Sequence, residues 1–289
     1  MINRNSLDIE TIKYNFRKIN VDEHKKIAYD ILVEFSKFCD NNNLKYFLAY
    51  GTLIGAVRHN GFIPWDDDID VQMPRKDYNK LIKIFNDKIN NSDLKLISPF
   101  EDKAKFTFVK ICNMKTVKIE SGLDYSDGFY YGIDIDVFPI DGKMTNQALY
   151  KKEFIQLERM FKLYNYFCFK QDLTSFRSKI LGRITSIIKY VVPSIKRKIM
   201  KKIDFLASKH NFETSETVGT QMFLYNYFTE KWSKKAFDET IEIKFEKDFF
   251  KCPKGYDEVL KNIYGNYMEL PPVEERVSTH LNDVYIERK

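Results

Sequence analysis

Three aspartates at alternate positions, Asp66, Asp68 and Asp70, constrain this chain more than any other feature of its sequence. An extended backbone points alternate side chains to one face, so the three carboxylates are expected to converge. Two carboxylates about 4 Å apart repel each other by about 4 kcal/mol at an effective dielectric constant near 20. We therefore expect a divalent cation between them.

Two other interpretations of these acids were weighed. A solvated acidic turn is disfavoured because Ile69, Val71 and Met73 alternate with the aspartates, the pattern of a strand with one buried face. A calcium loop of the helix-loop-helix kind would also use positions one, three and five, but Val71 stands where that loop requires glycine. The pattern favours a strand that carries carboxylates on its polar face.

The surrounding sequence predicts a strand, a turn and a helix in succession. A helix is expected over residues 22–43, followed by the short strand KYFLAY, a turn at Gly51-Thr52 and a helix that begins with TLIGAVR. A turn of this kind exposes backbone N–H groups that suit a phosphate oxygen, with Arg58 and His59 two turns further on. Ordinary strand-helix connections also use glycine, so the turn gains weight from the acids behind it.

A second acidic strand is predicted in the segment FYYGIDIDVFPI, residues 129–140, where Asp134 and Asp136 alternate with Ile133, Ile135 and Val137. Further elements are expected between and after these motifs. They are a helix over 74–87, strands over 94–98, 105–112, 116–120 and 236–247, helices over 145–210, and a helix in KGYDEVLKNIYG. We place a boundary near Thr145, which gives a catalytic core of residues 22–144 and a region of residues 145–289 that completes the site.

The composition of the 289-residue chain is that of a globular protein, with 44% hydrophobic and 30% charged residues. Its four cysteines have no paired spacing, which predicts reduced core thiols rather than a metal or redox site. The sequence contains neither a long apolar run nor a signal-like N-terminus, so we expect a cytoplasmic protein. The stretch 176–202 holds nine Lys or Arg residues and no acid, and an apolar stripe of isoleucines runs through it.

The order of strand, Gly-Thr turn, helix, acidic strand and later acidic strand resembles the nucleotidyltransferase fold shared with the palm of DNA polymerase beta. This resemblance implies an α+β fold, a mixed sheet flanked by helices, with an added helical region. The strings GTLIGAVRHNGFIPWDDDIDVQMPRKDY, GIDIDVFPID and YGNYMELPPVEERVSTH are similar to those of the LicD family of phosphocholine transferases, relatives of the fukutin-related proteins. The resemblance covers residues 24–282. Thr52 replaces the usual serine of the turn, and the gap from the turn to the acids is longer than usual.

The resemblance implies transfer of phosphocholine from CDP-choline to a hydroxyl of a cell-surface glycan, such as a teichoic acid, lipopolysaccharide or capsule precursor, with release of CMP. The fukutin-related branch implies CDP-alditol donors instead, and the sequence alone does not separate the two. Phosphoryl transfer of this kind suits two Mg²⁺ or Mn²⁺ ions. Asp68 and Asp70 are expected to bind the metal, with Asp136 as third ligand and base. Asp134 competes with Asp136, and Asp66 is either a ligand or a loop anchor.

Other residues are expected around the donor. Gly51, Thr52, Arg58, His59, Lys110, Arg276 and His280 are candidate contacts to the donor and its phosphates, although Lys110 could equally be a solvated strand residue. A quaternary ammonium group suits an aromatic cage, for which Trp65, Tyr130 and Tyr131 are the candidate walls. The basic stretch 176–202 either binds an anionic membrane surface at the inner face of the membrane or packs in the core.

Three rival functions are compatible with parts of this pattern. A glycosyltransferase also uses Asp-x-Asp to hold a metal and a sugar nucleotide, but its acids usually follow a long apolar strand without an earlier glycine turn. A pseudoenzyme or glycan-binding scaffold is disfavoured by the intact Asp68, Asp70 and Asp136. Nucleic-acid binding is not expected, because the basic residues are not interleaved with aromatic stacking platforms.

Overall fold

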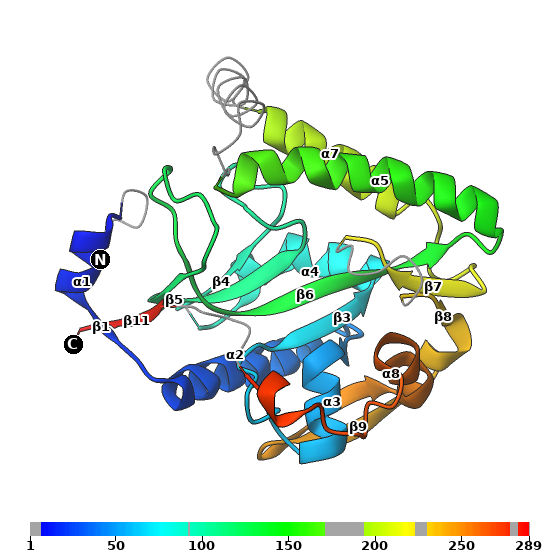
Figure 1. The fold of residues 1–289 in the computed structure, drawn as a ribbon, viewed down its shortest axis with the longest axis horizontal. Helices are drawn as coiled ribbons and strands as arrows, with labels where there is room; N and C mark the ends of the chain where they lie inside the picture. The colour runs from blue at the N-terminus through cyan, green and yellow to red at the C-terminus, as the bar shows by residue number, and fades with distance from the viewer. Residues whose placement is uncertain (1–6, 92, 171–193, 223–229, 278–282, 289) are drawn as a thin grey trace.

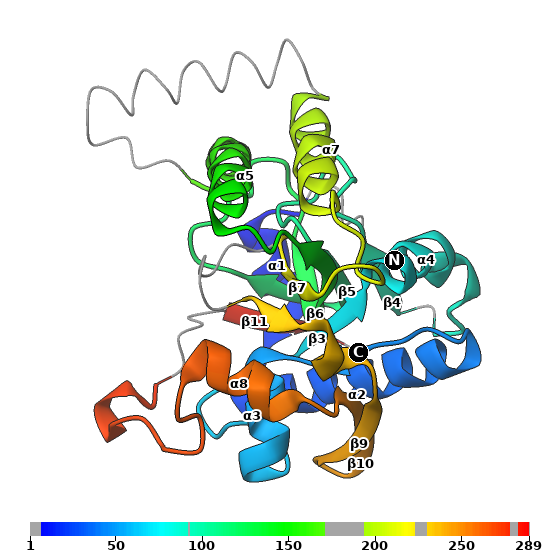
Figure 2. The same cartoon turned by 90° about the vertical axis from the view of Figure 1, so that its right-hand side faces the viewer.

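The structure is a computed structural model that describes residues 7–91, 93–170, 194–222, 230–277 and 283–288. A sheet crosses the middle of the molecule, with helices on both of its faces (Figures 1 and 2). The described helices are α1 (Ile9–Asn15), α2 (Val21–Asn41), α3 (Tyr50–His59), α4 (Arg75–Lys88), α5 (Gln147–Cys168), α7 (Ile195–Ala207) and α8 (Tyr256–Tyr264), with short 3₁₀ turns η2 (Lys234–Phe237) and η3 (Val273–Glu275). The fold is α+β, as the sequence predicted.

Over the described residues the main sheet has nine strands, and a separate hairpin has two. Its strands are β1 (Phe16–Lys18), β2 (Phe47–Leu48), β3 (Asp70–Pro74), β4 (Leu94–Ile97), β5 (Val109–Ile119), β6 (Tyr131–Lys143), β7 (Thr217–Thr220), β8 (Trp232–Ser233) and β11 (Asp283–Glu287). The principal order is β1-β11-β5-β6-β3-β2, with β4 paired to β5 and β7 to β6 and β8. Only the β3–β6 pair of these strands is parallel.

Alternate residues of the central strands divide the sheet into an apolar and a polar face. Val109 and Ile111 of β5, and Ile133, Ile135 and Val137 of β6, enter the main hydrophobic core. Helices α2, α3 and α4 cover this face, together with the hairpin of β9 (Thr240–Phe245) and β10 (Asp248–Pro253). The residues between them, such as Lys110 and Asp136, therefore project from the opposite face.

The helices that cover the apolar face follow their sequence signals. Helix α2 begins with a capping box in which Asn20 and Glu23 exchange bonds with each other's backbone N–H groups. Helix α4 begins directly after Pro74 and buries Tyr78, Leu81 and Phe85. The predicted helices over 22–43 and 74–87 are thereby confirmed to within two residues.

Helices α5 and α7 pack against each other on the polar side of the sheet (Figure 2). In α7, Ile199, Met200 and Ile203 are buried against a cluster that includes Leu157 and Tyr164 of α5. The apolar stripe of the basic stretch thus packs in the core over residues 195–207. The remainder of that stretch, 176–193, lies outside the described residues.

Several predicted boundaries were wrong. Gly51 and Thr52 lie inside the first turn of α3 rather than in a turn before it. The predicted strands 105–112 and 116–120 form one strand, β5, with a register irregularity between Asn113 and Lys118. The predicted strand 236–247 is β9 preceded by the turn η2. The division at Thr145 stays a prediction, and it falls between β6 and α5.

Two further predictions can be compared with the structure. All four cysteines are buried and none of them forms a disulfide, as expected for core thiols. Within the described part of the chain, no helix is both long enough and apolar enough to cross a membrane.

Candidate active site

A cavity of about 810 Å³ lies between the polar face of the sheet and helix α5. Its walls come from the start of α3, the loop before β3, strands β5 and β6, helix α5 and the segment after α8. The acids Asp66, Asp68, Asp70 and Asp136 all line it, as do Lys105, Lys110 and Lys118. The structure therefore brings the predicted acids from two separate segments into one cavity.

The parallel pairing of β3 with β6 sets the positions of Asp70 and Asp136. The two residues are direct register partners, and neighbouring strands lie about 4.8 Å apart. The backbone N–H of Asp136 donates to the carbonyl oxygen of Ile69 at 2.8 Å, and that of Asp70 donates to Thr52 Oγ1 at 2.8 Å. The sequence predicted that Thr52 contacts the CDP-linked donor. In the structure, its hydroxyl group accepts the hydrogen bond that fixes the start of β3.

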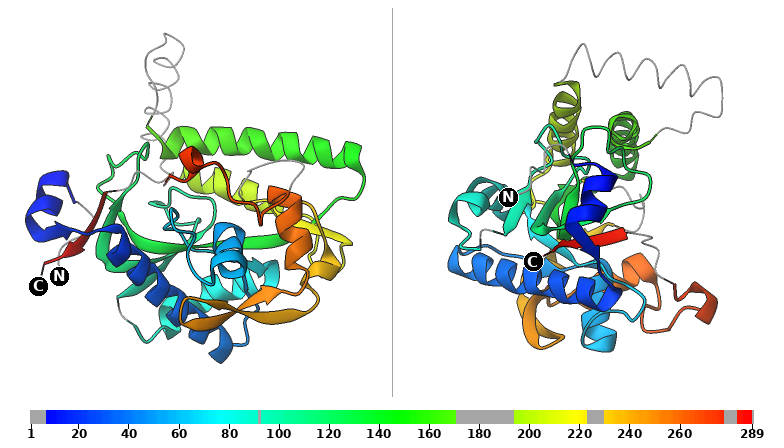
Figure 3. Two further views of the ribbon diagram at one scale, coloured as in Figure 1. Left: turned by 60° about the horizontal axis from the view of Figure 1, so that its bottom comes forward. Right: turned by 90° about the vertical axis from the view of Figure 1, so that its left-hand side faces the viewer.

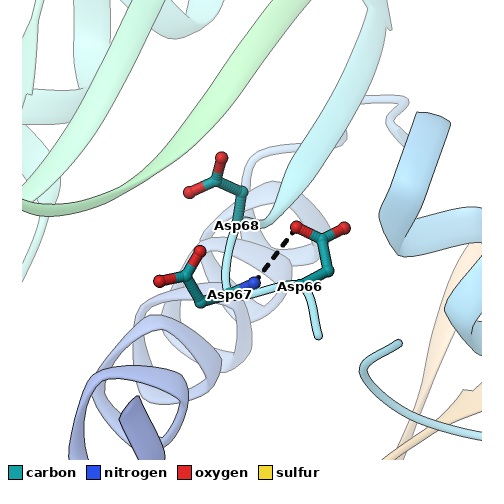
Figure 4. A group of neighbouring side chains, drawn as sticks. All are labelled: Asp66, Asp67 and Asp68. Carbon is teal, nitrogen blue, oxygen red and sulfur yellow. Dashed lines mark hydrogen bonds between the residues drawn. The ribbon is translucent and has the colours of Figure 1, made fainter. Parts of the chain in front are cut away.

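The acids Asp66 and Asp68 precede β3 and lie in an irregular segment, not on the strand. Each of Asp66, Asp67 and Asp68 places a carboxylate oxygen within 4.8 Å of the others (Figure 4). Asp67 points away toward α2, where its Oδ2 lies 3.2 Å from Nδ1 of the buried His24. Asp67 does not line the cavity, so we assign it to anchoring this segment rather than to the cavity.

Gly51 makes room for the acidic segment. A Cβ atom at position 51 would lie 2.6 Å from Oδ2 of Asp66. Real Cβ atoms do not approach an oxygen so closely, so a side chain at position 51 would shift the carboxylate of Asp66 from this position.

Electrostatics favour a cation among these carboxylates. Burial, followed by repulsion from Asp136, Asp68 and Asp66, raises the pKa of Asp70 well above its usual range. Burial likewise raises the pKa of Asp136 to about 7, even though Lys110 opposes the shift. Raised carboxyl pKa values mean that the ionised groups lack compensating charge, and a divalent cation would supply it. The carboxylate oxygens are ligands that Mg²⁺ and Mn²⁺ accept, so the residues present fit a metal ion.

Lys110 is held by carboxylates on the polar face of β6. Its Nζ lies 2.5 Å from Asp134 Oδ2 and 2.6 Å from Asp136 Oδ1. Asp134 is buried, yet Lys110 and Lys118 outweigh the effect of burial and lower its pKa. Lys118 also lies 3.3 Å from Glu120. Because its charge is already shared between two carboxylates, Lys110 holds Asp136 in place more readily than it could bind a free phosphate.

Asp134 and Asp136 therefore differ in environment although they share one face of β6. Asp134 is bound by two lysines and does not line the cavity, whereas Asp136 has one lysine partner and does line it. This difference favours Asp136 over Asp134 as the acid available to a ligand.

Arg58, His59 and Arg276 were also predicted to contact the CDP-linked donor, and the structure gives them other partners. Arg58 donates to the carbonyl oxygens of Tyr267 and Glu269 and to His59 Nε2, and neither Arg58 nor His59 lines the cavity. Arg276 donates to the carbonyl oxygen of Pro271 and lies 5.7 Å from the ring centre of Trp65. His280 lies outside the described residues.

The predicted aromatic cage of Trp65, Tyr130 and Tyr131 does not form. Trp65 lines the cavity, but Tyr130 stacks on Tyr125 at 4.4 Å in an apolar cluster with residues of α1. Tyr131 is buried in another cluster, and its hydroxyl accepts a bond from the N–H of Lys105. Adjacent strand residues point to opposite faces, so Tyr130 and Tyr131 could not have lined one site together.

Sequence reasoning missed several residues of the cavity. Tyr50 begins α3 with a positive φ of 44°, and its hydroxyl donates to Glu230 Oε1 at 2.9 Å. Phe106, Phe108 and Phe138 line the same wall. Phe138 could have been found, because it continues the alternation of Asp134 and Asp136, whereas nothing in the sequence links Tyr50 to Glu230.

Comparison with known proteins shows which sequences this chain is similar to. The sequence model of the family described as "LicD/FKTN/FKRP, nucleotidyltransferase domain" matches residues 43–181. The lipopolysaccharide cholinephosphotransferase LicD of Haemophilus influenzae is 28% identical over 272 residues, which cover 93% of this chain and 99% of that protein.

Two other relatives match over shorter stretches. Mannosyltransferase regulator 4 of Saccharomyces cerevisiae is 29% identical over 117 residues, 40% of this chain and 9% of that protein. An uncharacterised protein of Rickettsia typhi is 37% identical over 62 residues, 21% of this chain and 20% of that protein.

Proposed function

We propose, from the premise that this chain belongs to the LicD family, that it is a transferase that moves phosphocholine from CDP-choline to a hydroxyl group of a lipopolysaccharide or related glycan. The observation that carries the proposal is the meeting of Asp70 and Asp136 in a cavity of about 810 Å³, large enough for a nucleotide-linked donor. The order of the acidic strands also supports the nucleotidyltransferase-like arrangement inferred from the sequence.

The reaction exchanges one phosphoester bond for another. The acceptor hydroxyl loses its proton and forms a bond to the phosphorus that carries choline, while the bond between that phosphorus and CMP breaks. Asp136 accepts the proton, because it lines the cavity and burial raises its pKa to about 7, the range that suits a general base. Lys110 contacts Oδ1 of Asp136, so Oδ2 is the oxygen that would contact the cation and take the proton as the cation moves away.

A divalent cation would neutralise charge on the donor's diphosphate. Asp68, Asp70 and Asp136 are the residues that would hold it, with Asp66 beside them. Asp68 and Asp66 add negative charge around Asp70, so a cation would reduce the repulsion within this set of residues.

Substitution of the paired acids tests the proposal. Asp70→Asn and Asp136→Asn should each lower the metal-dependent release of CMP from CDP-choline by at least about a thousandfold, because the amide keeps the volume and removes the charge. In the absence of metal, both variants should unfold at a higher temperature than the wild type, since repulsion among the acids is reduced.

The matched control is Asp87→Asn, which changes an exposed carboxyl group on α4. It should retain wild-type activity. CMP release near the wild-type rate in either site variant would contradict the assignment. Parallel assays with CDP-glycerol, CDP-ribitol and UDP-sugars separate phosphocholine transfer from the alditol-phosphate and glycosyltransferase alternatives.

We infer in addition that the basic stretch 176–202 supports peripheral binding to anionic lipid. In the described part of this stretch, Lys198, Lys201 and Lys202 are exposed, and the apolar side of α7 is already used for packing. Binding should therefore be electrostatic. Co-sedimentation with anionic liposomes that does not fall with added salt would contradict it.

A further inference from the structure

The geometry points to a binding site for the donor's quaternary ammonium group on a wall of four aromatic rings, Tyr50, Phe106, Phe108 and Phe138. This inference rests on the proposed function, because among the donors considered only the choline donor carries a permanent trimethylammonium cation. It replaces the cage of Trp65, Tyr130 and Tyr131 that the sequence suggested.

The four rings form one continuous surface of the cavity. Phe108 lies between Phe138, at 4.4 Å between ring centres, and Phe106, at 5.5 Å. Tyr50 extends the row, 5.4 Å from Phe138. Neighbouring planes are inclined by 43°, 40° and 85°, so the wall has no flat platform of the kind on which a nucleobase stacks. Inclined faces suit a rounded cation, which is attracted to the negative face of each ring.

The electrostatics of the wall also favour a cation. The ammonium group of Lys110 already lies 4.3 Å from the centre of Phe106 and 5.6 Å from that of Phe108. At the other end, the Tyr50 hydroxyl donates to the carboxyl group of Glu230, which is 2% exposed. A phenol that donates to a carboxylate has a more electron-rich ring, and this strengthens its attraction for a cation.

The strand register places the wall at the correct distance from the acids. Lys110 and Asp136 are register partners on β5 and β6, and Phe138 follows Asp136 by two residues on the same face. Two residues along a strand advance by about 6.6 Å. In phosphocholine, two carbons and an ester oxygen separate phosphorus from nitrogen, which is a comparable span. A phosphoryl group at the acids therefore puts its choline substituent over Phe108 and Phe138.

The backbone at Tyr50 supports a functional role for its ring. Its φ of 44° lies in the left-handed region, which a bulky residue adopts only with backbone strain.

The experiment compares CDP-choline with its uncharged isostere, in which a 3,3-dimethylbutyl group replaces choline. Both fit the same volume, and only CDP-choline carries a positive charge. The wild type should prefer CDP-choline by at least about tenfold in kcat/KM for CMP release. Phe138→Leu, which keeps apolar volume and removes the ring, should narrow that preference by about three- to tenfold.

Two further variants complete the design. Phe161→Leu makes the same substitution on α5, in another wall of the cavity, and should leave the preference unchanged. Tyr50→Phe keeps the ring and removes its bond to Glu230, so it should narrow the preference by a smaller factor. This variant keeps the test valid if Phe138→Leu folds poorly.

The outcomes separate this inference from the proposed function. If the wild type releases CMP but Phe138→Leu loses kcat/KM equally for both donors, the wall binds by shape. If free CMP inhibits Phe138→Leu more weakly than it inhibits the wild type, the wall holds cytidine. Either result would overturn this inference and leave the proposed function standing. No CMP release from CDP-choline by the wild type would overturn the proposed function and this inference with it.

Discussion

At the scale of the residue, Gly51 has a larger effect on the acidic site than its lack of functional groups would suggest. Gly51→Ala should lower the affinity for Mn²⁺ by about tenfold. The added Cβ would lie 2.6 Å from Oδ2 of Asp66, so the carboxylate of Asp66 would have to move. The fold should not suffer, since alanine is favoured over glycine in a helix by about 1 kcal/mol. Isothermal titration with Mn²⁺ and thermal unfolding, measured on one preparation, check the two effects separately. Unchanged Mn²⁺ affinity would exclude Asp66 from the metal environment.

A second residue-scale prediction concerns pH. Burial raises the pKa of Asp136 to about 7, so below this pH a proton competes with the cation for the same carboxylate. The affinity for Mn²⁺ should fall by about fivefold between pH 7 and pH 6, and by more if Asp70 titrates in the same range.

The same shift affects the metal-free protein in the opposite direction. Between the ordinary carboxyl pKa and about 7, the folded state holds a proton that the unfolded state has released, so stability falls as pH rises through this window. In Asp136→Asn, the free energy of unfolding should fall less steeply with rising pH. Urea unfolding in chelator from about pH 5 to pH 8 measures this, and identical slopes in the two proteins would contradict the assignment.

The residues of the site were predictable to different degrees. Asp70 and Asp136 could be found because their alternation with apolar residues shows which face of each strand they occupy. The same alternation pointed to Asp68, although Asp68 lies before the strand. The role of Lys110 could not, because its sharing between Asp134 and Asp136 depends on the pairing of β5 with β6. Arg58 looked like a phosphate ligand only because the sequence does not show the carbonyl groups that it binds.

At the scale of the element, a buried ion-pair cluster connects three parts of the fold. Arg75, the first residue of α4, forms two bonds with Asp141 of β6 and a third, of 2.8 Å, with Asp204 of α7. Asp141 is fully buried. The cluster therefore joins the two helical layers through the sheet.

Substitution of Arg75 should be costly. Arg75→Met leaves the buried charge of Asp141 without a partner and should reduce the free energy of unfolding by about 3–5 kcal/mol. The matched control, Arg197→Met, breaks the exposed pair of Arg197 on α7 with Asp102 and should cost less than about 1 kcal/mol. Urea denaturation curves measure both. Equal losses of unfolding free energy in the two variants would show that the buried cluster stabilises the fold no more than an exposed ion pair does.

Elements with strong local signals were predicted well, and those that depend on pairing were not. Helix α2 has a capping box and a regular apolar face, and its bounds agree closely with the prediction. The two-residue strand β2 and the start of α3 at Tyr50 depend on β3 and on the strained backbone of Tyr50, so the expected turn at Gly51 was misplaced. The irregularity in β5 likewise arises from its partner β6.

At the scale of the whole molecule, the α+β class could be predicted, and the strand order could not. The cavity joins residues as distant in sequence as Tyr50 and Val277. Local periodicity indicates which face of a strand is polar, but long-range pairing decides which polar faces meet. The family resemblance supplied what the pattern alone lacked, namely that Asp136 belongs with Asp68 and Asp70.

Strand β11, near the C-terminus, lies between β1 and β5 in the sheet (Figure 3). This position decides when that edge of the sheet is completed during synthesis. During translation β1 leaves the ribosome early, but its hydrogen-bonding partner β11 emerges after all the other strands of the described part of the chain. Until then this edge of β5 stays open, with Val117 and its apolar neighbours accessible. A nascent chain of this protein therefore has to keep one sheet edge unpaired for most of its synthesis, which is when a holding chaperone would be of most use to it.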